Sequence, residues 1–189
     1  MRKVSLCLSI CVGCLVSVIP SPAQEVIHAL TGTVTSINAA AKMITVLQDN
    51  GSTSEFYSKP NSKGRIVLDK SIADGTTAAE QFNEQGAYVI VFYYGGTQDK
   101  TVVALKNLGA GPFTSTGGTI AKFDVHSHSL LVQDPTGAVQ TFRLTPDTVA
   151  EGNLGAVDGM KLQVQKGDRV RVVAETVNGA PTALFVRAN

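Results

Sequence analysis

The sequence contains no tryptophan, and only 16% of its 189 residues are charged, against about a quarter in an average soluble protein. With 43% hydrophobic residues, this composition excludes a disordered, collagen-like or coiled-coil chain. The 18 glycines and the frequent valine and threonine favour short strands and tight turns over helices. The predicted fold class is therefore all-β.

Cysteine is scarce as well, and all three cysteines lie in the first 23 residues, at Cys7, Cys11 and Cys14. This segment has a basic start, an apolar stretch over residues 4–19 and the small-x-small sequence Ser-Pro-Ala at 21–23. We interpret residues 1–23 as a cleaved secretory signal peptide. An uncleaved membrane anchor is the alternative, but the stretch is shorter than the roughly 20 apolar residues that span a bilayer.

The mature chain would begin at Gln24 and contain no cysteine, so no disulfide and no cysteine-ligated metal is expected. A lipoprotein attached through Cys14 is a weaker alternative, because Cys11 stands where a lipobox has leucine. Loss of Arg2 and Lys3 leaves 14 basic against 15 acidic residues. Such a chain lacks a general attraction for nucleic acid or an anionic membrane. We expect a periplasmic or secreted protein with neither partner, no stable membrane insertion and no cofactor.

The mature sequence is an internal repeat. Residues 32–38, GTVTSIN, recur 86 positions later as residues 118–124, GTIAKFD. The same offset relates Val46, Gly51, Phe56 and Pro60 to Val132, Gly137, Phe142 and Pro146. After a five-residue insertion in the first copy the offset becomes 81, and Gly86, Val89, Val91 and Thr101 match Gly167, Val170, Val172 and Thr182. Two copies of one module are therefore expected.

The small-residue segment 108–112 fits neither copy and is expected to join them. We place the first domain at residues 24–110 and the second at 111–189. Each has about 80 residues, which suffices for one modest hydrophobic core.

Within each copy apolar residues recur with a period of two, which predicts strands. We expect them at 31–38, 43–47, 53–58, 87–94 and 101–108, and again at 119–124, 129–133, 139–145, 169–176 and 181–187. Five short strands with the longest break after the third are typical of a small OB-like Greek-key barrel, and a sandwich is the alternative. In the first copy, the capping-box spacing of Thr77 and Glu80 predicts a short helix to about Asn83.

Several motifs resemble those of small periplasmic OB-like domains of unknown function. They are Gly-x-Val-x-x-Ile-Asn at 32–38, Thr-Pro-Asp-Thr at 145–148, Lys-Gly-Asp-Arg-Val at 166–170 and Thr-Ala-Leu-Phe-Val at 182–186. The resemblance covers nearly the whole mature chain and implies an exported protein with tandem OB-like domains. Because the motifs consist of glycine bends and alternating apolar residues, the resemblance implies a fold and no activity.

Residues 142–148 and 166–168 also resemble the periplasmic copper- and silver-binding OB proteins of metal efflux systems. That family implies a soft-metal site made by a histidine ending strand two, with a tryptophan and two methionines leading into strand three. The matching residues here are Gln-Asp-Pro at 133–135 and Ala-Val-Gln at 138–140, with Ser-Thr-Ser at 52–54 in the first copy. None of them is a soft ligand. We therefore expect the fold of that family without its metal.

His126 and His128 are the most suggestive pair of side chains. Two imidazoles at i and i+2 on an extended segment point to one face and could begin a Cu(II), Ni(II) or Zn(II) site. A third ligand would have to come from Asp124 or His28, so we favour an exposed turn that contains histidine. A soluble periplasmic metal-binding protein that uses His126 and His128 remains the alternative function.

No catalytic constellation is recognisable in the sequence. There is no serine with a histidine base and an orienting carboxylate, no nucleophile elbow, no suitably spaced carboxylate pair and no phosphate-binding loop. We therefore expect no catalytic residues and no enzymatic activity.

The fourth strand differs most between the copies. If Val89, Val91 and Tyr93 face the barrel interior, the outer face carries Tyr88, Ile90, Phe92 and Tyr94, where the second copy has Arg169, Arg171, Val173 and Glu175 in a solvated face. An apolar face of this size is either covered or used. We favour cover by the insertion, through Ile66, Val67, Leu68 and Phe82, or by the other domain.

The alternative is an interaction surface formed by Tyr88, Ile90, Phe92 and Tyr94. The function predicted from the sequence is thus an exported, non-enzymatic binding or interaction module for an unknown protein or small ligand.

Overall fold

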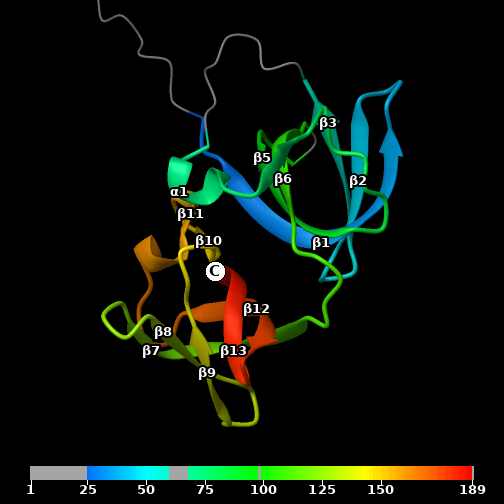
Figure 1. Ribbon diagram of the computed structural model, residues 1–189. Helices are drawn as coiled ribbons and strands as arrows, with labels where there is room; N and C mark the ends of the chain where they lie inside the picture. The colour runs from blue at the N-terminus through cyan, green and yellow to red at the C-terminus, as the bar shows by residue number, and fades with distance from the viewer. Residues whose placement is uncertain (1–24, 60–67, 98, 189) are drawn as a thin grey trace, which may run out of the picture.

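The computed structural model describes residues 25–59, 68–97 and 99–188. The predicted signal peptide and the insertion residues Ile66 and Val67 lie outside these ranges. The described chain is mostly strand and folds into two sheets that follow one another along the sequence (Figure 1). No helix in the described part of the chain is long and apolar enough to cross a membrane.

The first sheet contains six strands: β1 (His28–Asn38), β2 (Met43–Gln48), β3 (Thr53–Ser58), β4 (Thr76–Ala78), β5 (Tyr88–Tyr94) and β6 (Thr101–Asn107). Its order is β3-β2-β1-β5-β6-β4, and β3 also pairs with β6 through Tyr57–Thr101 and Ser58–Val102. This parallel seam closes five strands into the OB-like barrel that the sequence predicted. Residues from all five strands fill it, including Val46, Phe56 and Val91.

The second sheet contains β7 (Thr114–Asp124), β8 (Ser129–Gln133), β9 (Val139–Arg143), β10 (Val149–Gly152), β11 (Gly155–Asp158), β12 (Arg169–Val177) and β13 (Ala180–Ala188). Its order is β11-β10-β13-β12-β7-β8-β9, and β9 meets β13 at Arg143–Thr182. The five strands expected from the repeat thus form a second ring around Leu130, Phe142 and Val172.

The strand pattern did not predict the β10–β11 hairpin, which lies in the break after the third expected strand of the second copy. Gly152 and Gly155 pair at the end of this hairpin, and Gly155 has a φ of +89°, which only glycine adopts readily. The hairpin extends the sheet because β10 pairs with β13 in parallel. A 3₁₀ turn, η1 (Gly159–Lys161), follows it.

The helix predicted at residues 77–83 is wrong. Thr76–Ala78 form β4 and pair with β6, and Ala79 and Phe82 are buried in the first barrel. The short helix of this region is α1 (Lys70–Ala73), which begins after Asp69, whose carboxylate accepts from the Ser71 N–H at 2.9 Å. Pairing and burial therefore override the local capping preference.

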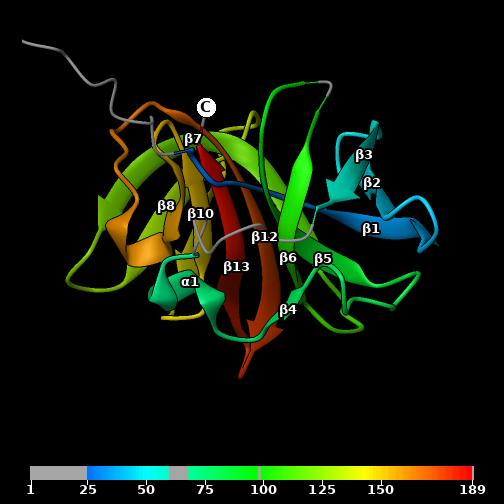
Figure 2. The same cartoon turned by 90° about the horizontal axis from the view of Figure 1, so that it is seen from above.

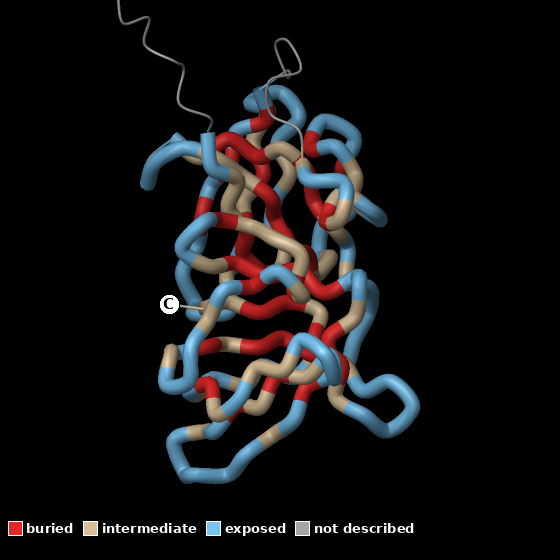
Figure 3. The backbone as a smooth tube through the Cα atoms, turned by 90° about the vertical axis from the view of Figure 1, so that its left-hand side faces the viewer, coloured by how far each residue is buried: buried red, intermediate tan, exposed pale blue. Residues whose placement is uncertain are grey.

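A third apolar cluster lies between the two barrels. It joins Ile90, Phe92 and Ile72 of the first copy to Val173 and Phe185 of the second. Figure 1 shows β5 and β6 above β12 and β13, and Figure 2 shows the same strands from above. Figure 3 shows buried residues in both the upper and the lower part of the molecule. The segment before β1 adds to the contact, since the Ala156 N–H donates to the Ile27 carbonyl at 2.7 Å.

Candidate functional site

The structure covers most of the outer face of β5. Ile90 and Phe92 are fully buried between the barrels, against Val173 and Phe185, with Leu68 packed on the same cluster. These two residues are therefore not a free interaction surface in this chain. The burial reflects the alternation of the strand, because Val89, Val91 and Tyr93 pack into the first barrel and their neighbours must face the second.

The two tyrosines of that face have separate roles. The Tyr88 ring stacks on Phe113 with 5.0 Å between centroids, and its hydroxyl donates to Asp49 at 3.0 Å. Burial is the main reason that the pKa of Tyr88 rises to about 12. Tyr94 instead lines a hollow in the first barrel.

The outer face of β12 is solvated only in part, in contrast to the sequence prediction: Arg169 is exposed, but Arg171 and Val173 meet the first barrel. Val173 is fully buried in the interbarrel cluster, and Arg171 forms an ion pair with Asp49 of the first barrel. Arg171 also donates to the Thr31 hydroxyl at 3.1 Å. The charge of Arg171 therefore contributes to the contact between the barrels.

A second polar contact joins the barrels through Glu151 on β10. One carboxylate oxygen lies 2.7 Å from His28 Nδ1, and the other accepts from the Ala29 N–H at 2.8 Å. Glu151 is buried, and this burial raises its pKa despite the opposing effects of His28, Ala29 and Arg187. We call Glu151, His28, Arg171 and Asp49 the interbarrel clamp.

Folding stability should fall as pH rises above the ordinary Glu pKa of 4.5, because the folded protein retains a proton on Glu151 that the unfolded chain has released. Glu151→Gln should flatten this dependence. Urea unfolding between about pH 4 and 7 tests the prediction, and repeating the pair in a His28→Gln background removes the contribution of that imidazole. Parallel pH profiles for the two proteins would contradict it.

His126 and His128 do not lie on an extended segment. They occupy the tight turn between β7 and β8, where His128 has a φ of +51° and Asp124 accepts from the N–H groups of His126 and Ser127. The Lys122 ammonium, which donates to this carboxylate, and the Ser127 N–H hold the pKa of Asp124 well below its usual range. His28, suggested as a third metal ligand, is hydrogen-bonded to Glu151. Among the described residues, no group of three or more His, Cys, Asp or Glu side chains is placed to hold a metal.

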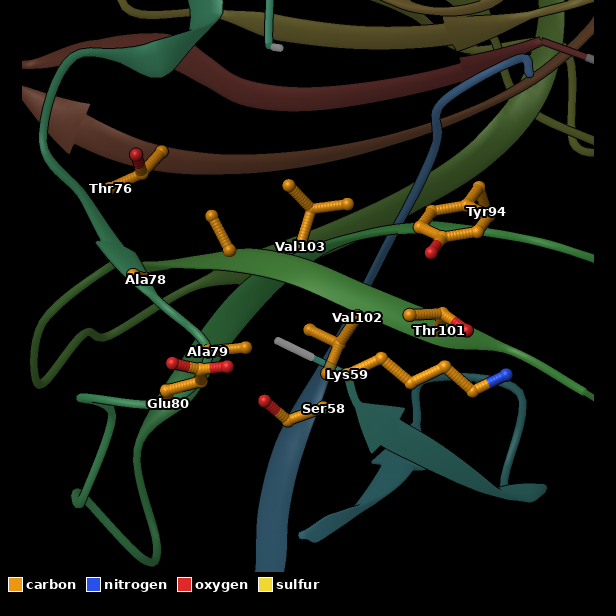
Figure 4. Close-up of a pocket in the computed structure, with 11 residues that line it drawn as sticks. Ser58, Lys59, Thr76, Ala78, Ala79, Glu80, Tyr94, Thr101, Val102 and Val103 are labelled. Atoms are coloured by element: carbon orange, nitrogen blue, oxygen red, sulfur yellow. The ribbon is translucent and has the colours of Figure 1, made fainter. Parts of the chain in front are cut away.

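A hollow of about 420 Å³ opens beside the seam of the first barrel, where β3 ends and β4 and β6 pair (Figure 4). An adjoining hollow of about 270 Å³ lies toward the β1–β2 turn. Both are lined by Ser58, Ala79 and Glu80. We call the two together the seam hollow, whose size lies in the usual range for small-molecule sites.

Ser58 is the unusual residue of the seam hollow. It is only 7% exposed, and its hydroxyl has no hydrogen-bond partner among the described residues. Figure 4 shows this hydroxyl turned toward Ala79 and Glu80. The repeat offset of 86 places Leu144 at the same position in the second copy, where it is 2% exposed and belongs to the core. The first barrel thus has a serine where its sister barrel has a packed leucine.

The rim of the seam hollow carries charge of both signs. Lys59 and Glu80 line the larger part, and Lys42 and Glu80 line the smaller part. All three side chains are exposed. None of them belongs to an ion pair within the described ranges.

The sequence patterns predicted no functional role for Ser58 or Glu80 and did not predict the interbarrel clamp. One signal was present, because the offset that aligns Phe56 with Phe142 and Pro60 with Pro146 also sets Ser58 against Leu144. The clamp left no such signal, since His28 and Glu151 come from different copies at unrelated positions.

No family model and no curated protein sequence matches the chain. Among solved structures it is similar to Ag(I)CusF, with 13% identity and a TM-score of 0.33 over 42% of this chain and all of that one. It is also similar to drosophila Unr CSD456, with 12% identity and a TM-score of 0.32 over 87% of this chain and 61% of that one.

Proposed function

We propose that the protein is an exported, non-enzymatic binding module and that the seam hollow holds its ligand. The observation that carries the proposal is the buried Ser58 hydroxyl, which has no hydrogen-bond partner among the described residues. Burial of such a group lowers the stability of the folded protein by about 1 to 3 kcal/mol. A ligand that hydrogen-bonds to Ser58 recovers this cost. The second barrel avoids it with Leu144, so the serine is not demanded by the fold.

Two further observations support the proposal. The residues that line the seam hollow include no histidine, which is the usual base for a serine nucleophile. The amino-terminal pattern of a signal peptide and the absence of cysteine after it support export.

Ser58→Leu should fill the hollow as Leu144 does in the second barrel, and should abolish ligand binding while the protein stays folded. The test is the thermal unfolding midpoint of the wild type and of the variant with single amino acids, dipeptides, monosaccharides and short carboxylic acids as probes. We expect at least one probe class to raise the wild-type midpoint and to leave that of Ser58→Leu unchanged.

Ser58→Ala is the matched control, because it removes the hydroxyl and keeps the space. It should weaken binding without abolishing it. The proposal fails if every probe shifts the wild type and Ser58→Leu equally, or if no probe shifts the wild type.

A further inference from the structure

The seam hollow combines an apolar wall with one buried hydrogen-bonding group. Val102 and Ala79 are buried along its larger part, and Ile44 and Phe82 along its smaller part. The Ser58 hydroxyl lies among them. This arrangement suits a ligand with an apolar body and at least one polar group, because a wholly apolar ligand would leave the hydroxyl without a partner.

The rim selects among such ligands by charge. Lys59 and Lys42 attract a ligand that carries only negative charge, but Glu80 repels it. Glu80 attracts a ligand that carries only positive charge, but the two lysines repel it. A ligand with both an ammonium and a carboxylate can complement all three side chains. A polyanion is disfavoured further by the near-neutral chain.

The dimensions of the seam hollow narrow the class of ligand further. The two parts of the seam hollow meet at Ser58, Ala79 and Glu80, so the groove is longer than its larger part alone. Lys59 and Glu80 lie on different segments, one directly after β3 and the other after β4, and do not form an ion pair with each other. Figure 4 shows Glu80 and the Lys59 ammonium on opposite sides of the hollow, so a ligand that reaches both carries its two charges at opposite ends, as a peptide with free termini does.

We infer that the seam hollow binds a short peptide with free amino and carboxyl ends and an apolar side chain, an inference that rests on the proposed binding function. The apolar side chain lies against the wall of the hollow, and a peptide N–H or C=O meets Ser58. The terminal carboxylate pairs with Lys59 or Lys42, and the terminal ammonium with Glu80. Since these charges are exposed, they contribute selectivity more than affinity.

The experiment measures binding of the dipeptide alanyl-leucine by calorimetric titration, together with its N-acetylated and C-terminally amidated forms. Either modification should weaken binding to the wild type by about two- to fivefold, as is usual for an exposed charge pair. In Glu80→Gln, acetylation should no longer matter while amidation still does. In the double variant Lys42→Gln with Lys59→Gln, the reverse should hold, and Ser58→Leu should bind none of the three.

The outcomes separate the two proposals. If the modified dipeptides bind the wild type as well as the free one, the peptide inference is overturned. If a neutral sugar or a carboxylic acid binds in a Ser58-dependent way and the dipeptide does not, the peptide inference fails and the binding function stands. If no probe binds in a Ser58-dependent way, both fail.

Discussion

Phe92→Ala should lower the free energy of unfolding by about 3 to 5 kcal/mol, the usual loss for a fully buried aromatic side chain. The side chain has no exposed surface and packs between the barrels against Val173 and Phe185. Its removal leaves a cavity at the contact that holds both barrels together. The thermal unfolding midpoint should fall by roughly 6 to 20 °C for a chain of this size.

Leu154→Ala is the control, because Leu154 is 70% exposed and its truncation should leave the midpoint nearly unchanged. A double variant of Phe92→Ala with Phe185→Ala should lose less than the sum of the single losses, since both side chains line one cluster. An unchanged midpoint for Phe92→Ala, together with loss of a co-purifying partner, would show that this face serves another molecule.

Gly118→Ala should destabilise the protein by about 3 kcal/mol, at the upper end for overpacking, because the added methyl group would overlap the backbone carbonyl of Gln133 and the Val132 side chain. The cause is the close approach of the paired strands β7 and β8, whose register shifts between Ile120 and Lys122. Backbone carbonyls cannot move aside as a flexible side chain does. Urea unfolding monitored by far-UV circular dichroism measures the loss.

The chain supplies an adjacent control in Gly117, where an added Cβ would meet no atom within 4 Å. Gly117→Ala should be neutral or slightly stabilising, because alanine reduces the entropy of the unfolded chain. Gly32→Ala should repeat the loss in the first barrel, where the methyl group would overlap the Leu47 carbonyl. Equal stability of the Gly117 and Gly118 variants would contradict this explanation of the repeated glycine.

The near-identical surroundings of Gly32 and Gly118 explain why the repeat was visible in the sequence. Each lies in the first strand of its copy, close to the end of the paired second strand, and the register shift that follows recurs between Val34 and Ser36 and between Ile120 and Lys122. Constraints of this kind act between strands that follow one another in the sequence. A pattern of glycines and alternating apolar residues was therefore enough to predict two OB-like barrels.

The sequence also predicts which residues of β5 share a face of the strand. Alternation along a strand places Val89, Val91 and Tyr93 on one face and Ile90 and Phe92 on the other, whatever lies beyond. The sequence alone could not decide which residues pack on the face that carries Ile90 and Phe92. That depends on how two barrels separated by a short connection meet, and the tertiary structure supplies it through Val173 and Phe185 of the other copy.

Predictions from local sequence were wrong where pairing with a distant strand decided the structure. Thr77 and Glu80 have the spacing of a helix start, yet β6 offers Thr76–Ala78 backbone partners and the barrel buries Phe82. The same physical reason hid the candidate site. Ser58 reads as an ordinary strand residue, and only closure of β3 on β6 buries its hydroxyl beside a hollow. The sequence by itself determined the class, the repeat and the strand faces, because these follow from neighbour-to-neighbour geometry. The tertiary structure decided the clamp and the hollow, because both depend on groups brought together from distant positions in the chain.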